Sequence, residues 1–295
     1  MIGLKRGEVQ LLNHQPSWKK EAHDMIDKIH HVMRDDALDI QHIGSTSIDS
    51  IKAKPIIDLV MAVHDFSIVK HKIPALAKLG FQYNPQADLP NAMYFNRKID
   101  NDTVSTHHLH VLKHNSFEWK HHINFRDYLN THKHVAKAYE SLKIKLLKAY
   151  PKDRVMYTEL KAPFIKQVIR KAQVHGFLNT IIEIQIDRPI GSTHPKHPEI
   201  IYPINYGYID QEMAPDGEYL DVYLLGVDKP VTSFVGKIIG IVHRENDVED
   251  KLVMAPIDKN YTKDVIQSMI HFQEQFYIST IETMDEPYKR GKIND

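Results

Sequence analysis

Three acidic residues lie close together in the second half of the sequence. Asp216, Glu218 and Asp221 fall within six residues, flanked by Gly217 and apolar positions. Clustered carboxylates in a partly buried site are costly unless cations neutralise them, and hard oxygen ligands select Mg²⁺ or Mn²⁺ over softer metals. The spacing therefore predicts a divalent metal site. The alternative is a solvated acidic turn, because Pro215-Asp216-Gly217 is itself a strong turn signal.

Further charged and aromatic residues surround this cluster. Glu183 lies on the preceding apolar segment, and residues 202–208 read Tyr-Pro-Ile-Asn-Tyr-Gly-Tyr, which includes Tyr202 and Tyr206. A second charged segment spans residues 245–251 and ends at a lysine. Together they offer ligands from several predicted strands and one cation for a phosphate. This set suits pyrophosphate, which would arrive as a magnesium complex.

The first half offers a second candidate site. A small turn at Gly44 and Ser45 precedes an apolar strand that carries Asp58. Backbone N–H groups of such a turn can hold phosphate oxygens, and the aspartate can hold a bridging Mg²⁺. His108 and His110 share one face of a predicted strand and could complete a single-metal site with Asp58. The alternatives are a structural turn and ordinary hydrogen-bonded histidines.

The first part of the chain resembles the GrpB family of the nucleotidyltransferase superfamily, over about residues 5–172. The shared landmarks are HIGSTS at 42–47, KPIID at 54–58, HLHV at 108–111 and FRDYL at 125–129. The resemblance implies a small mixed sheet with helices, in which Gly44 and Ser45 contact a nucleotide phosphate and two strand carboxylates bind magnesium. Val60 stands where the second carboxylate would be, and one aspartate is a poor holder of two ions.

The second part resembles the soluble, magnesium-dependent inorganic pyrophosphatases, over about residues 178–277. Asp216, Glu218 and Asp221 match the metal motif of that family, with Glu in place of the middle Asp. The resemblance implies that Asp216 and Asp221 bind the metal that activates a water molecule and that Glu218 helps to orient this water. It further implies active-site roles for five more residues: Glu183, Tyr202 and Tyr206 on neighbouring strands, Glu249 as a metal ligand, and Lys251 as a phosphate ligand.

Some expected cations are missing from this second part. His194 occupies the approximate place of a phosphate-binding arginine, and a basic residue expected just before it has no clear counterpart. The Tyr-Lys pair expected in the final helix reads Phe276-Tyr277. Losing cationic contacts should weaken the stabilisation of the leaving phosphate. His194, Lys196 and His197 are the available substitutes, which would make activity depend on pH.

The spacing of apolar residues predicts which helices and strands carry the candidate site residues. Residues 17–33 and 66–80 have helical spacing, and strands are expected at 39–43, 55–63, 92–95 and 108–112. Helical patterns dominate 117–172, with an interruption at Tyr150-Pro151. After His175 the pattern becomes strand-like until about residue 255, and a helix follows from 262 to 277. The predicted fold class is α/β plus α+β: a nucleotidyltransferase-like mixed sheet with helices in residues 1–175, and a small pyrophosphatase-like β-barrel with a terminal helix in residues 176–295.

Composition narrows the function classes. The 295 residues include no cysteine, so any metal must be held by oxygen or imidazole. No apolar run approaches the length of a membrane-spanning helix, and no signal peptide is recognisable, so we expect a cytoplasmic protein that does not bind membranes. Residues 1–175 carry 27 basic and 18 acidic side chains, and residues 176–295 carry 11 and 20. A basic half suits an anionic ligand such as a nucleotide, an acidic half suits divalent cations, and mutual attraction of the halves is the alternative.

The leading hypothesis is magnesium-dependent hydrolysis of pyrophosphate, or of a related phosphoanhydride, by the second part, fused to a nucleotide-binding domain. The alternative is a catalytically decayed regulatory protein that binds nucleotides or polyphosphate. The expected partners are pyrophosphate and a nucleotide. Nucleic acid is not expected, because the lysines are spread over helices without a recognised aromatic and basic motif. Self-association into a homo-oligomer stays open.

Overall fold

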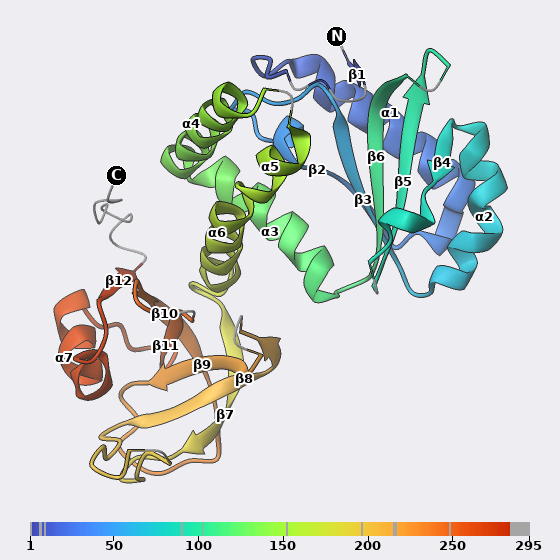
Figure 1. The fold of residues 1–295 in the computed structure, drawn as a ribbon. Helices are drawn as coiled ribbons and strands as arrows, with labels where there is room; N and C mark the ends of the chain where they lie inside the picture. Colours follow the sequence, from blue (N-terminus) through green and yellow to red (C-terminus); the bar gives the residue numbers. More distant parts are fainter. Residues whose placement is uncertain are drawn as a thin grey trace. The chain divides into compact units, whose positions relative to one another are not determined.

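The computed structural model describes residues 2–5, 8, 10–89, 91–101, 103–151, 153–195, 197–214, 217–247 and 249–283. The chain divides into two compact units, Met1–Ile169 and Arg170–Asp295. The division lies within one helix, α6 (Ala162–His175), whose last residue is where we predicted the domain boundary. Figure 1 shows the elements of both units.

The first unit is built on a six-stranded mixed sheet in the order β2-β3-β6-β5-β4, with β1 paired to β6. The strands are β1 (Leu4–Lys5), β2 (Asp39–Ile43), β3 (Ile57–Val63), β4 (Phe81–Tyr83), β5 (Ala92–Ile99) and β6 (Val104–Lys113). In β3 every residue except Asp58 is buried, because neighbours cover both of its edges. β2 matches the predicted strand residue for residue.

Helices complete the first unit: α1 (Pro16–Met33), α2 (Phe66–Lys78), α3 (Phe117–Thr131), α4 (Lys133–Ala149), α5 (Arg154–Glu159) and the first part of α6. Short 3₁₀ turns lie at Arg34–Asp36, Ser45–Ser47 and Pro85–Ala87. Pro16 opens α1, where its missing N–H costs nothing. The buried side of α1 packs in the main core through residues at helical spacing: Trp18, Ala22, Met25, Ile29 and Met33.

The second unit is a small barrel. Its strands are β7 (Ile181–Arg188), β8 (Asn205–Met213), β9 (Tyr219–Leu224), β10 (Ser233–Arg244) and β11 (Lys251–Ala255), followed by α7 (Lys263–Glu274) and β12 (Ser279–Thr283). The order is β11-β9-β8-β7-β10-β12, and pairing of β10 with β11 closes a ring of five strands. β10 can pair with β7, β11 and β12 because it is long and shifts register between Ile238 and Gly240.

Two hydrophobic clusters hold this barrel together. One includes residues such as Ile184, Leu220 and Ile241, and the other joins strand residues to Ile266 and Ile270 of α7. Both predicted architectures, a mixed sheet with helices followed by a small barrel with a helix near its end, are confirmed. The strand β12 was not predicted. No helix among the described residues is long and apolar enough to cross a bilayer.

Candidate functional site

A polar cavity of about 570 Å³ lies in the second unit. It is bordered by β7, β8, β9, β11, the segment after β10 and the end of α7. The acidic and basic residues that line it are Asp187, Arg188, His194, Glu218, Asp221, Arg244, Asp247, Glu249 and Lys251. Most of the residues predicted for the second site therefore lie in one place, although they come from segments far apart in the sequence.

Four of these predicted residues form the centre of the cavity. The Tyr206 hydroxyl donates to Asp221 Oδ2 at 2.6 Å, and Lys251 Nζ donates to the same oxygen at 2.5 Å. Lys251 also contacts Glu249 Oε2, while the other oxygen of Glu249 accepts from the Asp221 backbone N–H at 3.3 Å. Register places Tyr206 opposite Tyr223 on β9, two residues from Asp221, so neighbouring strands bring the pair together.

The electrostatics of this centre follow from burial of unequal charge. Two carboxylates share one ammonium group, and Glu249 and Lys251 are almost fully buried. Burial raises the pKa of Glu249, Lys251 lowers it in part, and Asp221 raises it again. Burial opposes the charge of Lys251, but the two carboxylates outweigh it and raise the pKa of the amine. The centre therefore has the negative balance that a divalent cation would offset.

Among the described residues, the other predicted ones lie around this centre with one exception. Glu218 is exposed and lines the cavity on the turn before β9, where Gly217 takes a φ of 91°. Tyr202 is fully buried, and its ring stacks on His194 with centroids 6.1 Å apart. Asp216 lies outside the described residues, as does Lys196.

The exception is Glu183, which is exposed on β7 and is not among the described residues that line the cavity. Ile184 next to it faces the barrel core, and Glu183 pairs in register with Val235 of β10. The acidic residue that β7 brings to the cavity is instead Asp187, near the end of the strand. A register shift between Ile186 and Arg188 breaks the alternation there, so that neighbouring residues both reach the cavity.

Arg188 is a cation that sequence reasoning missed. Its guanidinium carbon lies 5.1 Å from the centre of the Tyr206 ring and 5.9 Å from that of Tyr202, within cation–π range. It lines the cavity and pairs loosely with Asp187 at 3.7 Å. The signal was the Asp187-Arg188 pair at the end of an apolar run, directly before Pro189.

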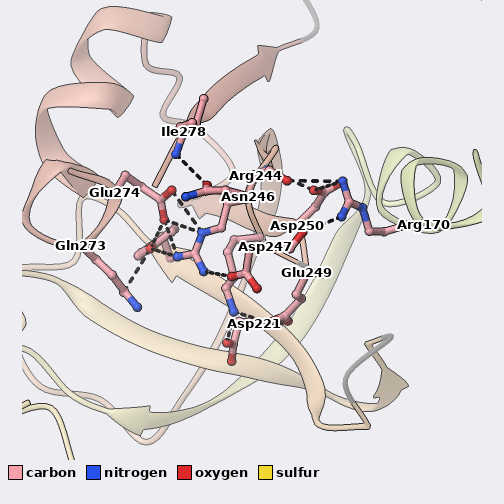
Figure 2. Close-up of polar contacts among 12 residues, drawn as sticks. Arg170, Asp221, Arg244, Asn246, Asp247, Glu249, Asp250, Gln273, Glu274 and Ile278 are labelled. Carbon is pink, nitrogen blue, oxygen red and sulfur yellow. Dashed lines mark hydrogen bonds and ion pairs between the residues drawn. The ribbon is translucent and has the colours of Figure 1, made fainter. Parts of the chain in front are cut away.

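Arg244 borders the same cavity, but other residues of the barrel hold its donors. Figure 2 shows its contacts, which include Nη2 to Glu274 Oε1 at 2.6 Å and Nη1 to Asp247 Oδ2 at 2.8 Å. Its guanidinium carbon also lies 3.6 Å from the centre of the Tyr277 ring. The arginine thereby ties the end of β10 to α7, and we assign it a structural role.

A second buried chain of charges begins beside Arg244. Arg170 contacts Asp250 Oδ1 at 3.5 Å, and the other oxygen of Asp250 lies 3.0 Å from His243 Nδ1. His243 Nε2 lies 2.8 Å from Glu282, which also contacts His175 at 3.1 Å. Burial opposes a charge on His243, but hydrogen bonds to the two carboxylates outweigh it and raise its pKa.

The predicted first site also gathers in a cavity, of about 500 Å³, within the first unit. Gly44, Ser45, Asp58, His108 and His110 all line it. Gly44 has a φ of 69°, and a Cβ there would collide with Asp58 Oδ2, so only glycine fits. His108 Nδ1 lies 2.9 Å from Asp58 Oδ1. Burial alone would raise the pKa of Asp58, but the hydrogen bond and charge of His108 lower it.

The surroundings of His110 on β6 and of Val60 on β3 limit what this site can bind. Burial lowers the pKa of His110 to about 4, so its imidazole is neutral at pH 7 and can act as a metal ligand. Val60 is fully buried in an apolar cluster with Ile43 and Leu112. Among the described residues that line this cavity, Asp58 is therefore the one strand carboxylate, whereas two-metal chemistry needs several anionic oxygens.

Comparisons with known proteins agree with this division. The model of the family described as GrpB protein matches residues 8–171, and that described as Inorganic pyrophosphatase matches residues 166–293. The chain is 34% identical over 173 residues to the glutamate-rich protein GrpB of Alkalihalophilus pseudofirmus, covering 58% of this chain and 99% of that protein. A crystal structure of the conserved protein GrpB from Enterococcus faecalis is similar with a TM-score of 0.51 and 28% identity, covering 55% of this chain and 96% of that one.

The second unit is also similar in sequence to part of a known protein. The chain is 30% identical over 96 residues to the inorganic pyrophosphatase of Haemophilus influenzae, which covers 29% of this chain. The match spans 54% of that protein, so the chain corresponds to about half of its length.

Proposed function

The chain belongs to the GrpB family and carries a second domain of the inorganic pyrophosphatase family, and from this premise we propose that the second domain hydrolyses pyrophosphate or a related phosphoanhydride with the help of Mg²⁺ or Mn²⁺. The observation that carries the proposal is the contact of Asp221 with Tyr206 and Lys251 inside a polar cavity. A structural ion pair alone would not need a cavity lined by further acidic and basic side chains.

The residues present fit a divalent cation. Asp221 and Glu249 offer carboxylate oxygens, the ligands that Mg²⁺ and Mn²⁺ prefer. The pKa of Glu249 is raised mainly by burial and further by the nearby charge of Asp221, so a cation would favour its ionised form. Glu218, and Asp216 two residues before it in the sequence, would add further oxygens. A bound cation would supply neutralisation of the phosphate charge and a more acidic water molecule.

The other side chains of the cavity have roles toward the substrate. Tyr206 fixes one oxygen of Asp221 by donating to it, so the carboxylate is held in one orientation. Lys251 and Arg188, which both line the cavity, supply positive charge for the phosphate groups. Arg188 thereby offsets the loss of the arginine that His194 replaces. Glu218 is positioned to orient the attacking water.

For the first domain we propose nucleotide binding in the cavity of Gly44, Ser45 and Asp58. Because Val60 replaces a second carboxylate, binding is better supported than nucleotidyl transfer. The fusion has a chemical logic in either case. Nucleotidyl transfer releases pyrophosphate, and hydrolysis of pyrophosphate would make such a transfer irreversible.

The test is phosphate release from magnesium pyrophosphate by the full-length protein. Asp221→Asn should abolish turnover, while Asp228→Asn, which changes an exposed aspartate outside the cavity, should leave it intact. Turnover that survives Asp221→Asn would refute the proposed site. Folded protein that binds magnesium pyrophosphate or a magnesium nucleotide without turning over any phosphoanhydride would support the regulatory alternative.

A further inference from the structure

Lys143 of α4 is a buried lysine on the wall of the first-unit cavity. Its side chain is almost fully buried, and Nζ donates to the Lys52 carbonyl oxygen at 2.6 Å and to Ser45 Oγ at 3.2 Å. Tyr139, which lines the same cavity as Ser45, has its ring centre 4.7 Å from Nζ. Among the described residues Lys143 has no ion pair, and a buried ammonium without one is rare.

Two further lysines line the same end of the cavity. Lys54 and Lys161 each place Nζ 4.5 Å from the centre of the Tyr157 ring. Tyr157 is fully buried, and its hydroxyl has no hydrogen-bond partner among the residues that the structure describes. The end of the cavity therefore combines three ammonium groups with three hydroxyl groups, those of Ser45, Tyr139 and Tyr157.

The three ammonium groups oppose one another's charge, so their arrangement at this end of the cavity is unfavourable without a ligand. Burial lowers the pKa of Lys143 to about 7, with the ammonium groups of Lys161 and Lys54 acting in the same direction. Glu140, on the same helix, acts in the opposite direction but also bonds Lys137 and the Lys52 backbone N–H. Clustered cations and an orphan hydroxyl are both relieved by one kind of ligand, an anion with several oxygens.

The rest of the cavity differs from this end. Apolar side chains such as Phe125, Ile165 and Ile169 line much of it. The carboxylate of Asp58 and four histidines complete its lining: His108, His110, His121 and His122. Burial lowers the pKa of His121 to about 4, so its imidazole is neutral at pH 7. A volume of about 500 Å³ is in the range of small-molecule pockets. The cavity thus has one cationic end and one largely apolar body.

We propose that Lys143, Ser45 and Tyr139, flanked by Lys54 and Lys161, bind the phosphate group of a small organic phosphate whose uncharged part lies along the apolar wall. This assignment deepens the proposed nucleotide binding of the first domain, because it names the end of the cavity that receives the phosphate. It also predicts that binding takes up a proton. An anion stabilises the charged form of Lys143, so affinity should fall as the pH rises above about 7.

The test is isothermal titration of the full-length protein with ATP and with inorganic phosphate, in EDTA and in two buffers of different ionisation enthalpy. The Asp221→Asn background removes metal-dependent turnover by the second domain. We expect proton uptake on binding, and a loss of affinity of about tenfold or more in Lys143→Met, because a charge-assisted contact is removed. Lys145→Met is the matched control, since Lys145 is exposed on the same helix.

Two conservative variants keep the test decisive if Lys143→Met fails to fold. Ser45→Ala and Tyr139→Phe each delete one hydroxyl group, and each should weaken binding less than Lys143→Met does. Equal affinity of Ser45→Ala, Tyr139→Phe and the parent protein for both probes would overturn the proposal. Phosphate release from magnesium pyrophosphate, measured for Lys143→Met without the Asp221 change, should stay at the wild-type rate. Failure of that hydrolysis in the wild-type protein would count against the second domain alone.

Discussion

Lys251 Nζ lies 2.5 Å from Asp221 Oδ2 and also contacts Glu249 Oε2, so one ammonium group links the carboxylates of β9 and of the segment before β11. The lysine therefore has two consequences. It limits the repulsion between the half-buried carboxylate of Asp221 and the buried carboxylate of Glu249, and it neutralises the same two acids to which we assign a divalent cation. The lysine and the cation are expected to stabilise the same pair of acids.

Lys251→Met should make the second domain depend on Mg²⁺ for stability. Without the ammonium group the buried carboxylate of Glu249 loses its partner, a change that typically costs about 3–5 kcal/mol, and the half-buried Asp221 loses a second one. Mg²⁺ should restore much of this loss, because binding to the folded state alone raises its stability. Urea unfolding in EDTA and in Mg²⁺ measures both effects, with Lys229→Met as an exposed control. If Mg²⁺ stabilised Lys251→Met and Lys229→Met by the same amount, this would contradict binding of the cation to the carboxylates that Lys251 contacts.

Tyr206→Phe should lower kcat/KM for magnesium pyrophosphate by about 10- to 100-fold. The change removes only the hydroxyl that donates to Asp221, and a hydrogen bond to a charged group contributes about 1.5–3 kcal/mol. Steady-state phosphate release measures the loss. Tyr261→Phe, outside the cavity lining, serves as the control. Full activity of Tyr206→Phe would show that Asp221 needs no such orientation.

Arg188→Met should raise the KM for magnesium pyrophosphate about tenfold, because a cation that faces the phosphate groups is lost. Methionine keeps most of the length and the contact with the Tyr206 ring. The kinetic comparison uses Lys229→Met, which removes a positive charge outside the cavity lining. A KM that does not change would assign Arg188 to packing on the tyrosines rather than to the substrate.

His243 should make the stability of the second domain depend on pH. The pKa of His243 is raised in the folded state by Asp250 and Glu282, with Arg170 and His175 beyond them. Its stabilisation is therefore complete below the unfolded pKa near 6.5 and is lost as the pH rises through the folded pKa. Each tenfold gain in the proton affinity of the folded state corresponds to about 1.4 kcal/mol of this stabilisation.

Urea unfolding between pH 6 and 9 checks this dependence. His243→Gln should remove the slope, whereas His197→Gln, an exposed histidine, should keep it. An unchanged slope in His243→Gln would place the titrating group elsewhere.

Arg244 and Glu274 should be strongly coupled in stability. Both side chains are almost fully buried and bonded to each other, so removing either leaves the other charge without its main partner. Arg244→Met and Glu274→Gln are each expected to cost about 3–5 kcal/mol, and the double variant should cost clearly less than their sum. A double-mutant cycle from urea unfolding gives the coupling, and additive losses would show that the pair is independent.

Local sequence patterns were sufficient for most of the fold. Apolar periodicity placed α1 and β2 to within one residue, because each element buries one side and the spacing of apolar residues records that side. The strand β12 was missed because Ser279–Thr283 is short and polar and is a strand only through its pairing with β10. Residues of the pyrophosphatase-like motif were found for a similar reason: Asp221 and Tyr206 belong to short, distinctive segments.

What the sequence by itself determined is the family of each of the two domains and most of their helices and strands. Tertiary structure decided which side chains meet. In the second domain, β7 brings Asp187 and Arg188 to the cavity and not Glu183. In the first domain, Gly44 lies against Asp58, because Ile43 and Asp58 are partners in the antiparallel register of β2 and β3. Spacing along a chain fixes the side of an element that a residue occupies, but a bulge or a long-range register fixes what lies opposite it.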